Sequence, residues 1–180
     1  MFQGWVPYAI IAVSAVVLIG VTIVLARSAW RRQVRRYLVG LMGRREAVGA
    51  ALKTAEGTVR TLASGTVQDL IAFTAPGSEE RRAVSEIAER MRMERGELVE
   101  LPLPKVLWPL ADFLGAAADG LAVQMGGVGD AEGEAALDAL AALDIASVKE
   151  SLQAADLAIA SLVEQYELTD PAVYGGGLYI

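Results

Sequence analysis

Residues 6–26, VPYAIIAVSAVVLIGVTIVLA, decide how this chain is organised, because the stretch contains no charged side chain. A helix of this length, rising about 1.5 Å per residue, spans roughly 31 Å, which matches the hydrocarbon core of a bilayer. Pro7 falls in the first turn, where a missing backbone N–H costs little. The stretch predicts a transmembrane helix over 6–26, with residues 1–5 as a short external N-terminus.

A cleaved signal peptide and a buried core helix are the two alternatives to a membrane span. A signal peptide has a basic segment before a shorter apolar stretch and a small-residue cleavage site after it. Here seven arginines follow the apolar run within the first 45 residues, and no charged residue precedes it. A core helix of this length needs a much larger protein around it. We therefore expect a single-pass signal-anchor.

The basic residues that follow the span predict its orientation. Residues 27–45 form a basic neck, whose arginines are Arg27, Arg31, Arg32, Arg35, Arg36, Arg44 and Arg45. Positive charge is enriched on the cytoplasmic side of membrane spans. The N-terminus is thus expected outside, and the rest of the chain in the cytoplasm. The 13 arginines against 3 lysines suggest a GC-rich bacterial genome, and hence the inner (plasma) membrane.

Aromatic and basic residues flank the apolar run on both sides, as is typical of membrane–water interfaces. The predicted membrane-interface residues are Trp5, Tyr8, Arg27, Trp30, Arg31, Arg32, Arg35, Arg36 and Tyr37. The partner expected for them is a bilayer with anionic head groups, at about 1 kcal/mol for each basic residue near the surface. Nucleic acid is not an expected partner, because the nine basic residues after position 45 are outnumbered by 22 acidic residues, which repel phosphate.

In residues 46–168 apolar residues recur in steps of three and four, and this spacing predicts an all-α fold. Together with the anchor, the expected fold is a single N-terminal transmembrane helix followed by a cytoplasmic antiparallel helical bundle of three to four helices. The same pattern allows self-association as an open coiled coil. The apolar series are Val48, Leu52, Ala55, Val59, Leu62, Thr66, Leu70 and Phe73; Val84, Ile87 and Met91; Leu107, Leu110, Leu114, Ala117 and Leu121; and Ile145, Val148, Leu152, Ala155, Ile159, Leu162 and Tyr166.

Proline, glycine and short polar residues predict where these helices begin and end. Pro76-Gly77 ends the first series, and Ser78 begins the second, which stops near Gly96. The stretch 97–104 is expected as an extended connector or a short edge strand, and 126–134 as a flexible turn. Ser147 with Glu150 is either a capping box or a surface pair.

The composition removes most catalytic chemistry from consideration. The chain has neither cysteine nor histidine, so it lacks thiolate sites and the commonest general base. No phosphate-binding glycine motif follows a predicted strand, and the acidic stretch 130–134 lacks the ligand order of a calcium loop. We expect Asp112, Asp119, Asp144 and Asp156 to be solvated or ion-paired. The prediction is a non-enzyme without metal, cofactor or small-molecule substrate.

Residues 169–180 form a tail of different character, because residues 172–180 carry no charged side chain and include three consecutive glycines. Three possibilities stay open for it: packing against its own bundle, adding as a strand to a partner's sheet, or capture of its last residues by a partner or protease. The residues predicted to contact a partner are Tyr174, Leu178, Tyr179 and Ile180.

The function expected from these features is a membrane-anchored, non-enzymatic scaffold or accessory subunit, which contacts protein partners at the cytoplasmic face or associates with itself. A single-pass sensor or regulator with a switchable bundle is the alternative from another class. An enzyme that uses carboxylates and a metal is the third.

Overall fold

A computed structural model describes residues 6–75 and 77–166, with side chains from Val17 onward, and nearly all of this part of the chain is helical. It contains six α-helices, one 3-10 turn and no strand, which confirms the all-α prediction. The elements are α1 (Val6–Ser64), α2 (Val67–Thr74), α3 (Glu79–Glu100), η1 (Lys105–Leu107), α4 (Trp108–Asp130), α5 (Glu134–Ala141) and α6 (Ile145–Gln165).

The chain forms two compact units that meet between Tyr37 and Leu38. In the first unit, the described residues 6–37 are the N-terminal part of α1, and they include the whole apolar run 6–26. The second unit starts with the rest of α1, residues 38–64, and contains all the other helices. The predicted neck, 27–45, is therefore divided between the two units.

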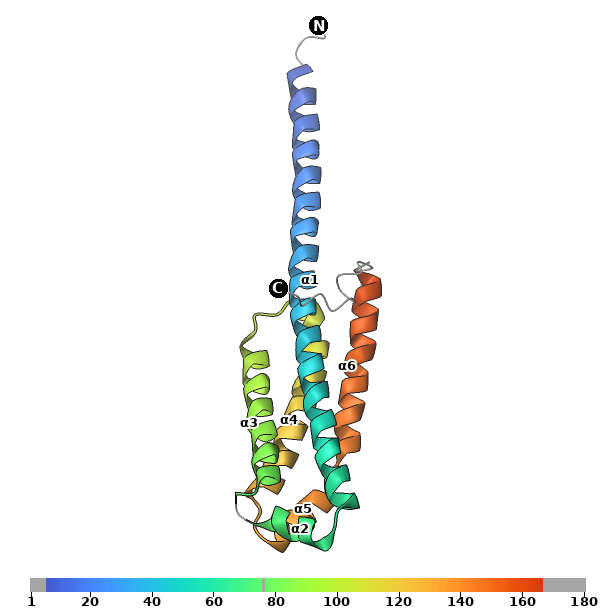
Figure 1. The fold of residues 1–180 in the computed structure, drawn as a ribbon. Coiled ribbons are helices and arrows are strands. Elements are labelled where there is room, and N and C mark those ends of the chain that lie inside the picture. The colour runs from blue at the N-terminus through green and yellow to red at the C-terminus, as the bar shows by residue number, and fades with distance from the viewer. Residues whose placement is uncertain (1–5, 76, 167–180) are drawn as a thin grey trace, which may run out of the picture. The chain divides into compact units, whose positions relative to one another are not determined.

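The second unit is an antiparallel four-helix bundle made of α1 from residue 38 onward, α3, α4 and α6 (Figure 1). Helix α4 packs against both α3 and α6. The short helices α2 and α5 contact each other at one end of the bundle, and the connector 101–104 lies at the other end. Short links between consecutive long helices make neighbours antiparallel, which is the up-and-down arrangement.

Ion pairs join α1 to both of its neighbours in this bundle. Arg44 donates to Glu94 at 2.8 Å and to Glu97 at 2.7 Å, both on α3. Arg45 forms a two-bond pair with Asp156 of α6, at 2.6 Å for each N–O distance. Further along, Glu56 of α1 meets Lys149 of α6. Because the α6 partner moves from 156 to 149 as α1 advances from 45 to 56, the two helices run antiparallel.

The predicted apolar series form the core. All five residues of the series that begins at Leu107 are fully or almost fully buried. The three residues predicted for α3 are buried as well. In α6 the middle of the series is buried and its ends, Ile145 and Tyr166, are half-buried. The series from Val48 to Phe73 is buried at both ends, but Thr66 in it is exposed because the helix breaks there. Burying one leucine side chain contributes about 1.5–3 kcal/mol, so this core supplies most of the gross stabilisation of the bundle.

The glycine-rich stretch after Met125 is helical, so the prediction of a flexible turn over 126–134 is wrong for its first half. Helix α4 continues to Asp130, and α3 side chains lie directly over its glycines. A Cβ at Gly126 would lie 2.6 Å from Arg92 Nη2, and one at Gly129 would lie 2.6 Å from Ser85 Oγ. Side chains of α3 occupy the space beside these two glycines, and this packing offsets the low helix propensity of glycine, about 1 kcal/mol per residue.

Two further helix boundaries differ from the prediction. Helix α3 passes through Gly96 and ends at Glu100, because Leu98 is buried and extends the apolar face; only 101–104 is a connector. The single helix expected from Val48 to Phe73 is broken after Ser64. There Thr66 starts α2 with a capping box, in which its hydroxyl accepts from the Asp69 N–H and the Asp69 carboxylate accepts from the Thr66 N–H.

The start of α6 is also capped differently from either possibility considered for Ser147. The carboxylate of Asp144 accepts a hydrogen bond from the Ser147 backbone N–H at 3.1 Å. Asp144 is thus the N-cap, and Ser147 lies inside the first turn, so Ser147 and Glu150 do not form the capping box considered for them.

One buried arginine closes the C-terminal end of α4. Arg81, only 8% exposed, donates from Nη2 to the carbonyl of Gly129 at 2.7 Å and also to the carbonyl of Ala131. The last carbonyls of a helix have no partner within the helix, and a cation also interacts favourably with the negative end of the helix dipole. Arg81 therefore connects the start of α3 to the end of α4.

Replacing Arg81 by alanine is expected to lower the free energy of unfolding of the bundle by about 2 kcal/mol, since hydrogen bonds from a charged group contribute about 1.5–3 kcal/mol. Chemical denaturation of the full-length protein in mild detergent, followed by circular dichroism, measures this loss. Its neighbour Arg82 is exposed, so Arg82→Ala is the matched control, expected within about 0.5 kcal/mol of the native protein. Equal effects for the two variants would contradict the role given to Arg81.

Candidate functional site

The C-terminal half of the apolar run carries large apolar side chains that nothing in the described structure covers. Their exposed fractions lie between 49% and 72%. They are Val17, Leu18, Ile19, Val21, Ile23, Val24 and Leu25. Because they include consecutive positions, they surround the helix instead of forming one apolar face, and a helix that is apolar all round requires an apolar surrounding.

The polar side chains of this segment have hydrogen-bond partners within the helix itself. The hydroxyl of Thr22 donates to the Leu18 carbonyl at 2.8 Å, and that of Ser28 donates to the Leu25 carbonyl at 2.9 Å. In this conformation the hydroxyl groups need no water. The described side chains from Val17 to Ala26 therefore present an almost entirely apolar surface, although Thr22 lies among them.

The predicted interface residues after Ala26 lie on α1 and are mostly exposed. Arg27, Arg31, Arg32 and Arg36 are exposed, and Arg35 and Tyr37 are half-buried. Trp30 is 46% exposed. The first acidic residue in the sequence is Glu46, so these guanidinium groups lie in a segment without carboxylates. Guanidinium groups bind phosphate with two parallel hydrogen bonds, and phosphate is the anionic group of a lipid head group.

Some predicted site residues cannot be placed. Trp5 and the tail residues Tyr174, Leu178, Tyr179 and Ile180 lie outside the described residues, and so does the side chain of Tyr8. The structure does describe two other predicted neck residues, Arg44 and Arg45. Both belong to the bundle unit, where they pair with Glu94, Glu97 and Asp156.

Among the residues whose side chains the structure describes, from Val17 onward, the segment Lys105–Asp130 is long and apolar enough to cross a membrane. Residues 6–16 of the apolar run lie outside this part of the chain. Lys105–Asp130 comprises η1 and α4, the central helix of the bundle, and 44% of its most apolar part is buried against neighbours. Its exposed surface carries Asp112 and Asp119. The contacts of α4 with α3 and α6 thus explain why this helix is long and apolar. A core helix of a bundle can be as long and as apolar as a membrane-spanning helix.

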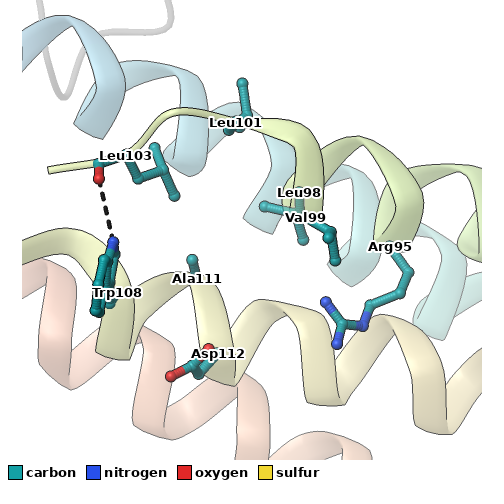
Figure 2. Close-up of a pocket in the computed structure, with 8 residues that line it drawn as sticks. All are labelled: Arg95, Leu98, Val99, Leu101, Leu103, Trp108, Ala111 and Asp112. Carbon is teal, nitrogen blue, oxygen red and sulfur yellow. Dashed lines mark hydrogen bonds between the residues drawn. The ribbon is translucent and has the colours of Figure 1, made fainter. Parts of the chain in front are cut away.

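A shallow cavity of about 310 Å³ opens where α3, the connector and α4 meet (Figure 2). Trp108 forms one wall, held by a 3.1 Å hydrogen bond from its Nε1 to the Leu103 carbonyl. The ammonium of Lys105 lies 5.8 Å from the centroid of the Trp108 ring, within the range of a cation–π interaction. The remaining lining is Arg95, Leu98, Val99, Leu101, Ala111 and Asp112.

This cavity is suited to binding and lacks the parts of a catalytic site. Its side chains are apolar except for Arg95, Asp112 and the indole N–H of Trp108, which is already bonded. It contains no hydroxyl or thiol nucleophile with a neighbouring base. An exposed indole beside branched apolar side chains can accept one apolar side chain of a partner, with the two charged groups at its edge.

Of the four carboxylates considered for metal or acid–base chemistry, two serve a cap or an ion pair, and the other two, Asp112 and Asp119, are exposed. Asp144 caps α6, and Asp156 holds Arg45 in a pair that raises the pKa of the guanidinium. Hydrogen bonds from the Thr66 backbone and hydroxyl lower the pKa of Asp69 in the capping box of α2. Among the described residues, no group of three carboxylates is placed to hold a metal ion.

Sequence reasoning missed a second, more apolar groove, which lies between the end of α1, α2 and α5. It was missed because α2 and α5 were not predicted as helices of their own. The signal was present: Leu137, Leu140 and Ala141 have the spacing of one helix face, and Thr66 with Asp69 has the spacing of a capping box.

Comparison with known proteins adds no assignment to these features. No family model, no curated protein and no solved structure matches the chain.

Proposed function

We propose that this protein is a single-pass membrane protein, anchored by residues 6–26, whose cytoplasmic bundle is a non-enzymatic binding module for other proteins. The observation that carries the proposal is the ring of exposed apolar side chains over residues 17–25, followed directly by the five arginines of residues 27–36, four of which are exposed. Leaving such side chains in water forgoes about 25 cal/mol for each Å² that lipid would cover. Lipid is the surrounding that satisfies all sides of this helix at once.

The arginines support a defined orientation of the anchor. The five arginines between 27 and 36 follow the span within about 15 Å along a helix, which is within reach of the head groups. Their excess on this side favours the cytoplasm for everything that follows. Trp30 fits the same level, because an indole places an apolar ring and a polar N–H at the boundary between lipid and water.

The binding role rests on what the bundle offers and on what it lacks. Its surface carries a cavity at the connector, lined by apolar side chains with Arg95 and Asp112, and a wholly apolar groove between α1, α2 and α5. Neither of these two has a nucleophile with a base in its lining. Anchoring restricts such a module to the membrane plane and raises its effective concentration toward membrane-bound partners.

If residues 6–26 anchor the protein, two aspartates introduced at the centre of this segment should abolish membrane retention. Each charged residue at the middle of a span costs about 2.5–3.5 kcal/mol on insertion scales. We expect the native protein to pellet with membranes after alkaline washing, and a Val17→Asp/Ile19→Asp variant to appear mainly in the supernatant. The measurement is fractionation followed by immunoblotting of the full-length chain.

The control for this experiment is a charge at an equally exposed apolar site of the bundle. Leu157 on α6 is 68% exposed, close to the values in the anchor. Leu157→Asp should remain in the membrane pellet. A native protein that stayed in the supernatant would disprove the anchor.

The absence of cysteine makes the orientation directly testable, because a single introduced thiol is unique in the chain. We expect Gln3→Cys to react with a membrane-impermeant maleimide in intact cells. Glu134→Cys, at an exposed position on α5, should react only after the membrane is permeabilised. The opposite pattern would place the bundle outside and refute the proposed topology.

The binding role predicts partners that copurify in constant proportion with the full-length protein from mild detergent. A version that ends after Pro171 tests the share of the tail in this contact. We expect it to lose part of the copurifying protein while keeping its own abundance. If neither version retained a partner, and each purified alone at the mass of a monomer, the binding role would be wrong.

A further inference from the structure

The groove between α1, α2 and α5 has the lining of a site for a helix. Its residues form short rows with the spacing of helix faces: Val59, Leu62 and Ala63 on α1, then Leu137, Leu140 and Ala141 on α5, with Gly65 and Leu70 between them. The groove encloses about 340 Å³ and is open to solvent along its length. None of its lining side chains is polar, whereas small-molecule sites contain placed polar groups that orient the ligand.

Exposed apolar side chains continue the groove onto α2. Val67 is 73% exposed and Ile71 is 63% exposed, and both flank Leu70 on the outer side of this two-turn helix. The buried side of α2 is held by Phe73, which is fully buried. Helix α2 therefore divides its apolar residues between the core and an open surface.

Charge decides which partner fits this surface. Residues 60–82 and 130–144, which form this end of the bundle, contain eight exposed carboxylates against three arginines. One of these arginines, Arg81, is already bonded to carbonyls at the end of α4. The exposed acids are Asp69, Glu79, Glu80, Asp130, Glu132, Glu134, Asp138 and Asp144.

The excess of carboxylates at this end of the bundle disfavours several occupants of the groove. Nucleic acid and anionic lipid would be repelled, and so would the same end of a second copy of this chain. A helix with an apolar face and basic flanks satisfies both the groove and these carboxylates.

We propose that the groove between α1, α2 and α5 binds a basic amphipathic helix of a partner protein. The partner helix lays leucine-like side chains across the half-buried Leu70, Leu137 and Leu140, and its lysines or arginines face Glu134 and Asp138. The inference rests on the proposed binding role and names the chemistry of the partner. It does not depend on the membrane anchor, because every residue involved belongs to the bundle unit.

The test uses the full-length protein in nanodiscs of zwitterionic lipid and three labelled peptides of about 18 residues. One peptide has leucines at helical spacing and lysines elsewhere, the second has glutamates in place of the lysines, and the third is a scramble of the first. We expect micromolar binding of the first peptide by fluorescence anisotropy. The other two should bind at least about tenfold more weakly, because each lacks one of the two complementary features. Empty nanodiscs measure background binding.

Paired variants assign the binding to this groove. Val67→Ser/Ile71→Ser should weaken the first peptide about tenfold, as expected when two apolar contacts of this size are lost. The matched control is Val123→Ser/Leu157→Ser, which changes two equally exposed side chains on α4 and α6 and should leave binding unchanged. Glu134→Gln/Asp138→Asn should weaken binding several-fold at low salt, and Asp112→Asn/Asp119→Asn should not.

Hydrogen exchange on the same complex locates the contact independently of affinity. The peptide should slow exchange in residues 59–75 and 134–141 and leave α6 unchanged. Equal binding of the scrambled or acidic peptide, no binding of the basic peptide, or self-association that the Val67→Ser/Ile71→Ser variant abolishes would each overturn the inference. Membrane retention and copurifying partners could persist in any of these cases, so a failure here is distinct from a failure of the proposed function.

Discussion

The bundle depends on the burial of α4 between α3 and α6. Leu107, Leu110, Leu114 and Leu121 are all excluded from solvent, and Gly126 and Gly129 let α3 approach the same helix closely. A larger residue at either glycine would meet Arg92 or Ser85 at 2.6 Å, so the interface between α3 and α4 is specified by small residues as much as by large ones. The position of α4 in turn fixes where Arg81 finds its carbonyl partners and where the connector begins. The cavity at the connector then follows from where the chain leaves α3 and enters α4.

Arginine has several different structural roles in this one chain, and its environment decides which. In residues 27–36 it lies on a segment without acids and is mostly exposed. Arg44 and Arg45 come a few residues later in the same helix, and they pair with carboxylates of α3 and α6. Arg81 is buried and bonds to carbonyl groups, whereas Arg92 and Arg95 lie over the glycines of α4. The basic neck is predicted from charge alone and therefore extends to Arg45. The bundle unit already begins at Leu38, because charge does not show which arginines pair with carboxylates.

Sequence patterns predicted the all-α class and most core residues, because apolar spacing reports directly which face of a helix is covered. They located the break at Pro76-Gly77, since proline and glycine act locally. They failed where tertiary contacts override local propensity. Gly96 and Gly126 both lie within helices because a buried Leu98 and a close α3 outweigh the cost of glycine. The groove between α1, α2 and α5 joins residues more than 70 positions apart, and no local pattern identifies such a contact. The anchor and its orientation remain predictions from the sequence.

The two apolar surfaces of this chain differ in charge, and this difference separates their partners. The exposed side chains of residues 17–25 are followed by arginines, and the groove between α1, α2 and α5 is bordered by carboxylates. Apolar burial supplies affinity in both places, but it does not distinguish a lipid chain from a leucine of another protein. In the two proposals made above, the charged border makes that distinction, because arginines attract phosphate and carboxylates repel it. The proposed bilayer and the proposed basic helix then use different surfaces, so neither ligand competes for the site of the other.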